Sequence, residues 1–156
     1  MAVSLRSMYY DTKDKYKIKL IAGEKGKGKT KMLMAKANND IKITGGNIVY
    51  LDKNNKHMYE LSNRVRLINV PEYNIHSADM FLGFIYGIVS QDYDLDRMFL
   101  DNFMSISNIT TVDEIENLIK ELVIISDKFE VDFIIGISKK KEDLTDYLKE
   151  FVTIVL

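Results

Sequence analysis

The stretch IKLIAGEKGKGKT, residues 18–30, decides the fold of this chain. It opens with the apolar run Ile18–Ala22, continues through a segment of three glycines and three lysines, and leads at Thr30 into a helical pattern that extends to about Ile41. A short apolar run is typical of a buried strand, and apolar residues at three-and-four spacing are typical of a helix. The sequence therefore predicts a strand, a tight glycine-rich turn and a helix in direct succession.

The same alternation of strand and helix continues to the end of the chain. Apolar runs predict further strands at 48–51, 65–70, 98–100, 133–137 and 153–156, and the polar stretch 52–63 has room for one helical turn. Ser77 caps a predicted helix to about Ser90, a capping box at 111–114 opens a long one, and a third spans about 144–151. Apolar strands that alternate with helices indicate a parallel sheet covered on both faces. We expect a three-layer α/β/α fold with a mostly parallel sheet of five or six strands.

Length and composition limit the class of protein. A chain of 156 residues with 46% hydrophobic residues has the size of one domain, which we assign to residues 17–156, after a leader of unknown role at residues 1–16. The chain has no cysteine, which excludes disulfides and thiolate metal sites and fits a cytoplasmic location. It also lacks the ~20 consecutive apolar residues of a membrane helix, so no membrane span is expected.

Charge is distributed unevenly along the chain. Residues 1–36 carry ten Lys or Arg and three Asp or Glu, although the whole chain has a net charge of −1. A nearly neutral total does not indicate nucleic-acid binding, which usually requires a broad basic face. A concentrated basic end fits a small anionic ligand better.

Four residues of the glycine-rich stretch match the pattern G-x-x-x-x-G-K-[ST] at every fixed position: Gly23, Gly28, Lys29 and Thr30. Glycines let the backbone curl so that successive N–H groups point inward, and the start of the following helix adds a partial positive charge. Such a turn binds phosphate groups, and the flanking strand and helix are the setting that it requires. On these residues the chain resembles the P-loop NTPase superfamily, whose members bind a nucleoside triphosphate together with Mg²⁺.

The resemblance implies a role for each matching residue. The two glycines shape the loop, Lys29 contacts the β- and γ-phosphates, and the Thr30 hydroxyl binds Mg²⁺. The residues between them would contribute mainly backbone amides: Glu24, Lys25, Gly26 and Lys27. A second magnesium ligand in such sites is an acidic residue at the end of an apolar strand, and Asp101 after Met98-Phe99-Leu100 occupies that place.

Two further strands, at 48–51 and 65–70, lie between the loop and Asp101, and this layout resembles the RecA-like ATPases over roughly residues 17–137. In that branch a polar residue at the tip of the fifth strand contacts the γ-phosphate, a role that falls on Ser138, which could instead cap the next helix. GTP-binding relatives carry an [NT]-K-x-D motif, whereas residues 138–141 read SKKK. ATP is therefore the expected nucleotide.

The chain departs from these relatives where they hold the carboxylate that activates water. Asn102 follows the magnesium aspartate, and Asn54 lies two residues beyond Asp52, the acidic end of the second strand. An amide can orient a water molecule but cannot accept its proton as a base does. Asp52 is the nearest alternative carboxylate, or else an ordinary turn residue. The sequence predicts slow hydrolysis, with Lys29, Asp52 and Asn102 as the candidate catalytic residues.

Three functions stay open at this point. The first is an Mg·ATP-binding switch or subunit that hydrolyses ATP slowly or only with a protein partner or a second copy of the chain. The second is a nucleotide-binding interaction module without hydrolysis. The third is a small-molecule or nucleoside kinase, which is disfavoured because such enzymes gather arginines around the phosphates and this chain has only four. The histidines, His57 and His76, are predicted to be surface residues rather than ligands.

Overall fold

The computed structural model of the protein describes residues 18–156, so the predicted leader, residues 1–16, lies outside the described residues. Six strands form one sheet in the order β3-β2-β4-β5-β1-β6, and every neighbouring pair is parallel. The strands are β1 (Ile18–Ala22), β2 (Asn47–Asp52), β3 (Arg66–Asn69), β4 (Leu95–Asp101), β5 (Asp132–Ile137) and β6 (Val152–Val155). The predicted parallel α/β sheet is confirmed, with six strands.

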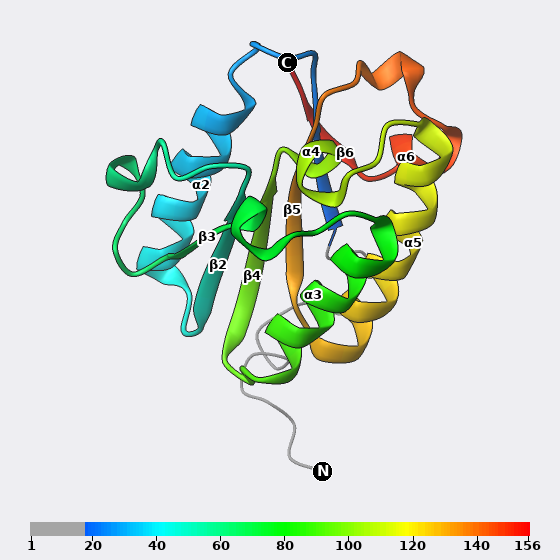
Figure 1. The fold of residues 1–156 in the computed structure, drawn as a ribbon. Coiled ribbons are helices and arrows are strands. Elements are labelled where there is room, and N and C mark those ends of the chain that lie inside the picture. The colour runs from blue at the N-terminus through cyan, green and yellow to red at the C-terminus, as the bar shows by residue number, and fades with distance from the viewer. Residues whose placement is uncertain (1–17) are drawn as a thin grey trace.

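Helices cover both faces of this sheet, which makes the fold a three-layer α/β/α arrangement consistent with a RecA-like fold. Figure 1 shows α2 (Lys29–Ile43) on one side of the sheet, and α3 (Ala78–Ser90) and α5 (Val112–Phe129) on the other. The shorter elements are α4 (Phe103–Ser107), α6 (Asp146–Lys149) and the 3₁₀ turns η1 (Met58–Glu60), η2 (Val70–Tyr73) and η3 (Lys141–Asp143).

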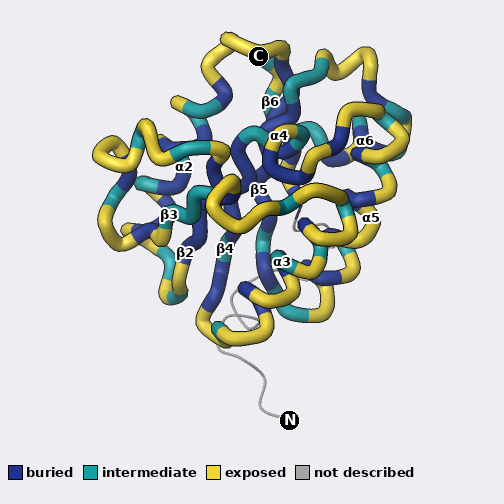
Figure 2. The backbone as a smooth tube through the Cα atoms, viewed as in Figure 1, coloured by how far each residue is buried: buried dark blue, intermediate teal, exposed yellow. Residues whose placement is uncertain are grey.

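Two apolar clusters, one on each face, hold the layers together. The smaller cluster packs Leu33, Ala37 and Ile41 of α2 against Tyr50 and Phe99 of the sheet. The larger one joins the opposite face of the sheet to α3, α4, α5 and α6. Figure 2 shows the inner strands as buried and the outward turns of the helices as exposed. Burial on both faces explains why the strand sequences are apolar throughout rather than alternating.

Most predicted elements are confirmed, including the Ser77 cap and the capping box in which the Thr111 side chain accepts from the Glu114 N–H. Two differences have local causes. The helix α4 was not predicted, because its five residues are too few for a helical period. The predicted helix over 144–151 is reduced to α6, because the Thr145 side chain accepts from the Leu148 N–H and so begins the helix there.

All six strands end at the same edge of the sheet, which lies at the top of Figure 1. The glycine-rich loop follows β1 there, and β5 separates β1 from β4, the strand that ends in Asp101. The last residue, Leu156, also lies at this edge: its N–H donates to the Ala22 carbonyl at 2.9 Å. A Cβ at Gly23 would come within 3.1 Å of Leu156, so a larger residue at the first loop position would require Leu156 to shift by a few tenths of an ångström.

Candidate functional site

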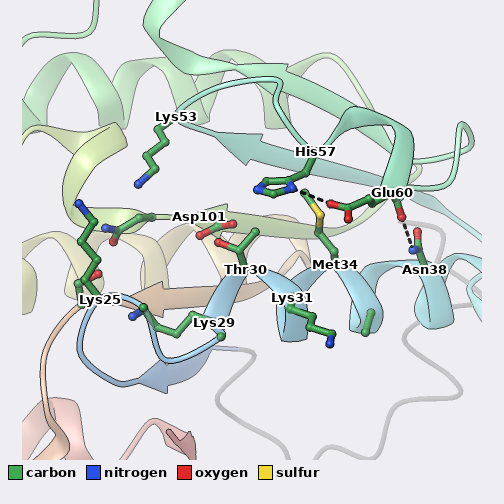
Figure 3. A pocket seen from close by; sticks show the side chains of 15 residues that line it. Lys25, Lys29, Thr30, Lys31, Met34, Asn38, Lys53, His57, Glu60 and Asp101 are labelled. Carbon is green, nitrogen blue, oxygen red and sulfur yellow. Dashed lines mark hydrogen bonds and ion pairs between the residues drawn. The ribbon is translucent and has the colours of Figure 1, made fainter.

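A cavity of about 760 Å³ opens at the carboxyl edge of the sheet, between the glycine-rich loop, helix α2 and the segment after β2. In parallel α/β sheets, ligands bind in the crevice outside the carboxyl ends of the strands. The predicted residues that line it are Lys25, Gly26, Gly28, Lys29, Thr30, Asp101, Asn102 and Ser138. Figure 3 shows the cavity from close by, with Thr30 facing Asp101. Residues separated by more than a hundred positions in the sequence therefore meet in one place.

The loop adopts a conformation that only glycine tolerates at two positions. Gly26 and Gly28 have φ angles of 85° and 92°, in the left-handed region where a Cβ is strained. Gly28 is the N-cap of α2 and has no side chain with which to cap it. The first N–H groups of α2 have no partner within the helix, so they are available to an anion. The loop thus has the backbone that phosphate binding requires.

The Lys29 side chain lies along this loop. Its ammonium donates to the carbonyls of Gly23 at 2.6 Å and Glu24 at 2.9 Å, and the residue is 7% exposed. Burial lowers the pKa of Lys29, and the nearby Asp101 carboxylate opposes that change. An ammonium held by two carbonyls at the end of a cavity is positioned to exchange them for phosphate oxygens.

Two carboxylates end the neighbouring strands β2 and β4. Asp52 and Asp101 are register partners, and both are 3% exposed. The Tyr50 hydroxyl donates to Asp101 Oδ2 at 2.8 Å, and burial together with Asp101 raises the pKa of Tyr50. Burial first, and then the charge of Asp101, raise the pKa of Asp52 to about 6. Two buried carboxylates side by side repel each other, so a cation between or in front of them would be stabilising.

The donor set fits Mg²⁺ bound together with a nucleotide. Asp52 Oδ2 and Asn102 Oδ1 are buried and accept no hydrogen bond from the described residues. No group of three or more His, Cys, Asp or Glu that could hold a metal exists within residues 18–156. Magnesium in nucleotide sites usually has one or two carboxylates and completes its shell with phosphates and water. The edge of the sheet offers that number of oxygen ligands, and Thr30 lies beside them (Figure 3).

Some predicted residues lie outside this cavity. The Glu24 carboxylate pairs with Lys140 at 3.1 Å, and both line a separate cavity of about 330 Å³ that also includes Lys27. Asn54 does not line either cavity, because its Oδ1 accepts from the Lys56 N–H at 2.9 Å within its own turn. The suggestion that Asn54 stands in for a catalytic carboxylate stays a prediction.

Asp52 lies behind the cavity surface rather than on it. Its Oδ1 accepts from the Lys53 N–H at 2.7 Å, and the residue is not among those that line the cavity. The catalytic role of Asp52 stays a prediction.

Several cavity residues were missed by sequence reasoning. The missed residues are Lys31, Met34, Ala35 and Asn38 on α2, and Lys53, His57 and Glu60 after β2. His57 is partly exposed, as predicted for a surface residue, and it also borders the cavity and pairs with Glu60 at 2.6 Å. Asn38 fixes this wall, because its Nδ2 donates to the Glu60 carbonyl and its Oδ1 accepts from the Ser62 N–H. The helical spacing of 31, 34, 35 and 38 was the one available signal.

None of the helices within residues 18–156 combines the length and the apolarity that crossing a membrane requires. Compared with known protein families and with curated proteins, the chain matches none. Its functional interpretation therefore depends on the loop sequence and on the geometry of the cavity.

Proposed function

We propose that this protein binds Mg·ATP in the 760 Å³ cavity and hydrolyses it slowly, or only with a partner, as a nucleotide-dependent switch or subunit. One observation carries the proposal: the G-x-x-x-x-G-K-[ST] loop has its glycines in the left-handed region and opens α2 directly opposite a strand-end aspartate. This combination supports membership of the P-loop NTPase superfamily. The proposal includes a cytoplasmic location and a protein partner or second copy of the chain.

Each residue has a defined task in this proposal. The amides at the start of α2 and Lys29 bind the phosphate oxygens, and Lys29 neutralises charge on the terminal phosphate. Thr30 and Asp101 hold the magnesium ion, which when bound would neutralise the phosphates and align them for attack by water. Ser138, at the end of β5, lies on the cavity wall and can donate a hydrogen bond to the same phosphate. Tyr50 orients Asp101 through the 2.8 Å hydrogen bond.

Slow turnover follows from what lies next to Asp101. Asn102 lines the cavity where a base would be useful, and its amide can orient a water molecule but not deprotonate it. Asp52 has a pKa suited to a base, but it does not line the cavity and one of its oxygens accepts a hydrogen bond from the Lys53 N–H. A positioned general base typically contributes ~10²–10⁴-fold to a rate, so its absence leaves a weak ATPase. A partner that supplies the missing general base would then control the rate of ATP hydrolysis.

The decisive experiment is calorimetry with Mg·ATP on the wild type and on Lys29→Ala. Loss of a charge-assisted hydrogen bond should weaken binding at least about tenfold. Lys42→Ala is the matched control, because Lys42 is exposed in the last turn of the same helix and should bind as the wild type does. Equal affinity in Lys29→Ala and the wild type would contradict the phosphate-binding role of the loop.

A small-molecule kinase is the second candidate, and one observation favours it. The cavity continues past Asp101 along α2 to Asn38, which leaves space beyond the expected terminal phosphate. Against it, none of the arginines in residues 18–156 lines the cavity, and Arg97 is engaged by Asp40 at 2.6 Å. Phosphate release without an acceptor supports the ATPase. Transfer only to an added acceptor supports the kinase, and binding without either supports a non-hydrolysing module.

A further inference from the structure

Lys53 follows β2 directly and enters the cavity from the wall opposite the glycine-rich loop. Its N–H donates to Asp52 Oδ1 at 2.7 Å, which fixes the turn at the end of the strand. Figure 3 shows the Lys53 side chain extending toward the space in front of Asp101, with Lys25 reaching the same space from the loop. The two lysines therefore approach the expected position of the terminal phosphate from opposite sides.

The lysines around this space outnumber the carboxylates. Within residues 18–156 the Lys53 ammonium forms no hydrogen bond or ion pair, and it is close enough to Lys29 to lower the pKa of that residue. Lys25, Lys29 and Lys53 thus line one cavity. Its two carboxylates within the described residues are Asp101 and Glu60, and Glu60 pairs with His57 at 2.6 Å. Gathering three ammonium groups is unfavourable in the free protein and becomes favourable when a polyanion binds among them.

The segment that carries Lys53 is joined to the rest of the fold at its two ends. It begins at Asp52, and its far end is held by Asn38, which bonds the Glu60 carbonyl and the Ser62 N–H at 2.9 Å and 2.7 Å. Between these anchors lies the single 3₁₀ turn η1, with Tyr59 93% exposed. Within the segment the hydrogen bonds are short-range, such as those from the Met58 N–H to the Asn55 carbonyl and from the Glu60 N–H to the His57 carbonyl. A phosphate contact made by Lys53 would add a connection across the cavity and should slow local opening of residues 53–60.

We propose that Lys53 binds the terminal phosphate of the nucleotide, so that the segment 53–60 distinguishes a triphosphate from a diphosphate. The inference rests on the proposed function, because it requires a nucleotide on the loop. A diphosphate bound by Lys29 and the α2 amides would end short of Lys53, whereas a triphosphate would reach the space in front of Asp101. Lys53 is thus a specificity-determining contact that the G-x-x-x-x-G-K-[ST] motif does not contain.

The test compares Mg·AMP-PNP, a triphosphate that is not hydrolysed, with Mg·ADP by calorimetry. In Lys53→Met the affinity for AMP-PNP should fall at least about tenfold, while the affinity for ADP stays within about twofold. Lys53→Arg should keep most of the preference for the triphosphate, because the charge is retained. Lys56→Met is the matched control: Lys56 is exposed on the same segment and does not line the cavity.

A second readout follows the segment itself. Hydrogen exchange of the amides at 54–60 should be slower with AMP-PNP than with ADP in the wild type, and this difference should vanish in Lys53→Met. If Lys53→Met binds both nucleotides as the wild type does, the inference is overturned and the proposed function stays intact. The same conclusion follows if Lys53→Met loses affinity for both nucleotides equally while circular dichroism shows that the variant is folded. A wild type that binds neither nucleotide overturns the proposed function as well.

Discussion

Asp52 is a buried carboxylic acid whose surroundings destabilise its charged form. It is buried beside Asp101, one oxygen accepts from the Lys53 N–H, and the other has no hydrogen-bond partner within the described residues. A buried acid with a like charge next to it is stabilised when it is protonated or when a cation is present. The residue therefore lowers the stability of the nucleotide-free protein at neutral pH.

Asp52→Asn should raise the melting temperature at pH 7.5 in the absence of nucleotide and magnesium. The folded-state pKa of about 6 lies above the ordinary value of 3.8, so the folded protein loses stability from this group as the pH rises from about 4 to about 6. Below that window the wild-type acid is protonated in both states, and the variant should have no advantage. Melting curves from pH 4 to 8 measure the difference between variant and wild type.

Glu121→Gln, an exposed acid in the middle of α5, is the control and should change the melting temperature little at either pH. A gain for Asp52→Asn that is the same at pH 4 and pH 7.5 would show that the ionised carboxylate is not the cause.

The loop between β1 and α2 is the element whose backbone conformation matters most for the site. Because Gly28 has φ 92° and serves as the N-cap of α2, its conformation sets the direction of the first free N–H groups of the helix. Any other residue there either strains the backbone or changes that direction.

Gly28→Ala should destabilise the protein by about 1–2 kcal/mol, which is the cost of placing a Cβ in the left-handed region. No heavy atom lies within 4 Å of the added Cβ, so steric contact should contribute nothing further. The midpoint of urea denaturation measures the change. Gly45→Ala is the matched control: that added Cβ is equally free of contacts and φ is not positive, so the midpoint should stay the same or rise slightly. Equal losses in both variants would contradict the backbone explanation.

The glycine-rich loop and the helix starts were predictable from the sequence because their signals are local. The loop pattern fixes its own conformation, and the capping box at Thr111 and Glu114 marks a helix start within four residues. The wall formed by Lys53 and His57 was not predictable, because the path of residues 53–60 depends on hydrogen bonds to Asn38, more than twenty positions away.

At the scale of the whole molecule, a bound nucleotide would add contacts between the loop, α2 and the ends of β4 and β5. The loop is already joined to β5 by the hydrogen bond from the Gly23 N–H to the Ile137 carbonyl, and β4 pairs with β5. A ligand that binds the folded state alone raises stability by ~2.7 kcal/mol at a hundredfold excess over its dissociation constant. For a protein of this size, that gain corresponds to a rise in melting temperature of about 5–10 °C.

We expect ATP to give this rise only when Mg²⁺ is present, and Asp101→Asn to lose most of the magnesium-dependent part. Asp101 and Thr30 act through the ion, so without it they contribute little to nucleotide binding. Thermal shift assays with ATP and either MgCl₂ or EDTA measure both effects. Asp127→Asn, an exposed acid on α5, should retain the full shift. A wild-type shift that is the same in EDTA would count against the magnesium site.

The position of Leu156 has a practical consequence for anyone who handles this protein. Because Leu156 bonds to Ala22 and lies against Gly23, any chain joined after it, whether an affinity tag or a fused reporter, would emerge beside the glycine-rich loop. Such an extension would begin at the separate 330 Å³ cavity that Leu156 lines together with Glu24 and Lys27 of the loop. A fluorophore at Tyr93, which is fully exposed at the opposite edge of the sheet, would leave that entrance clear.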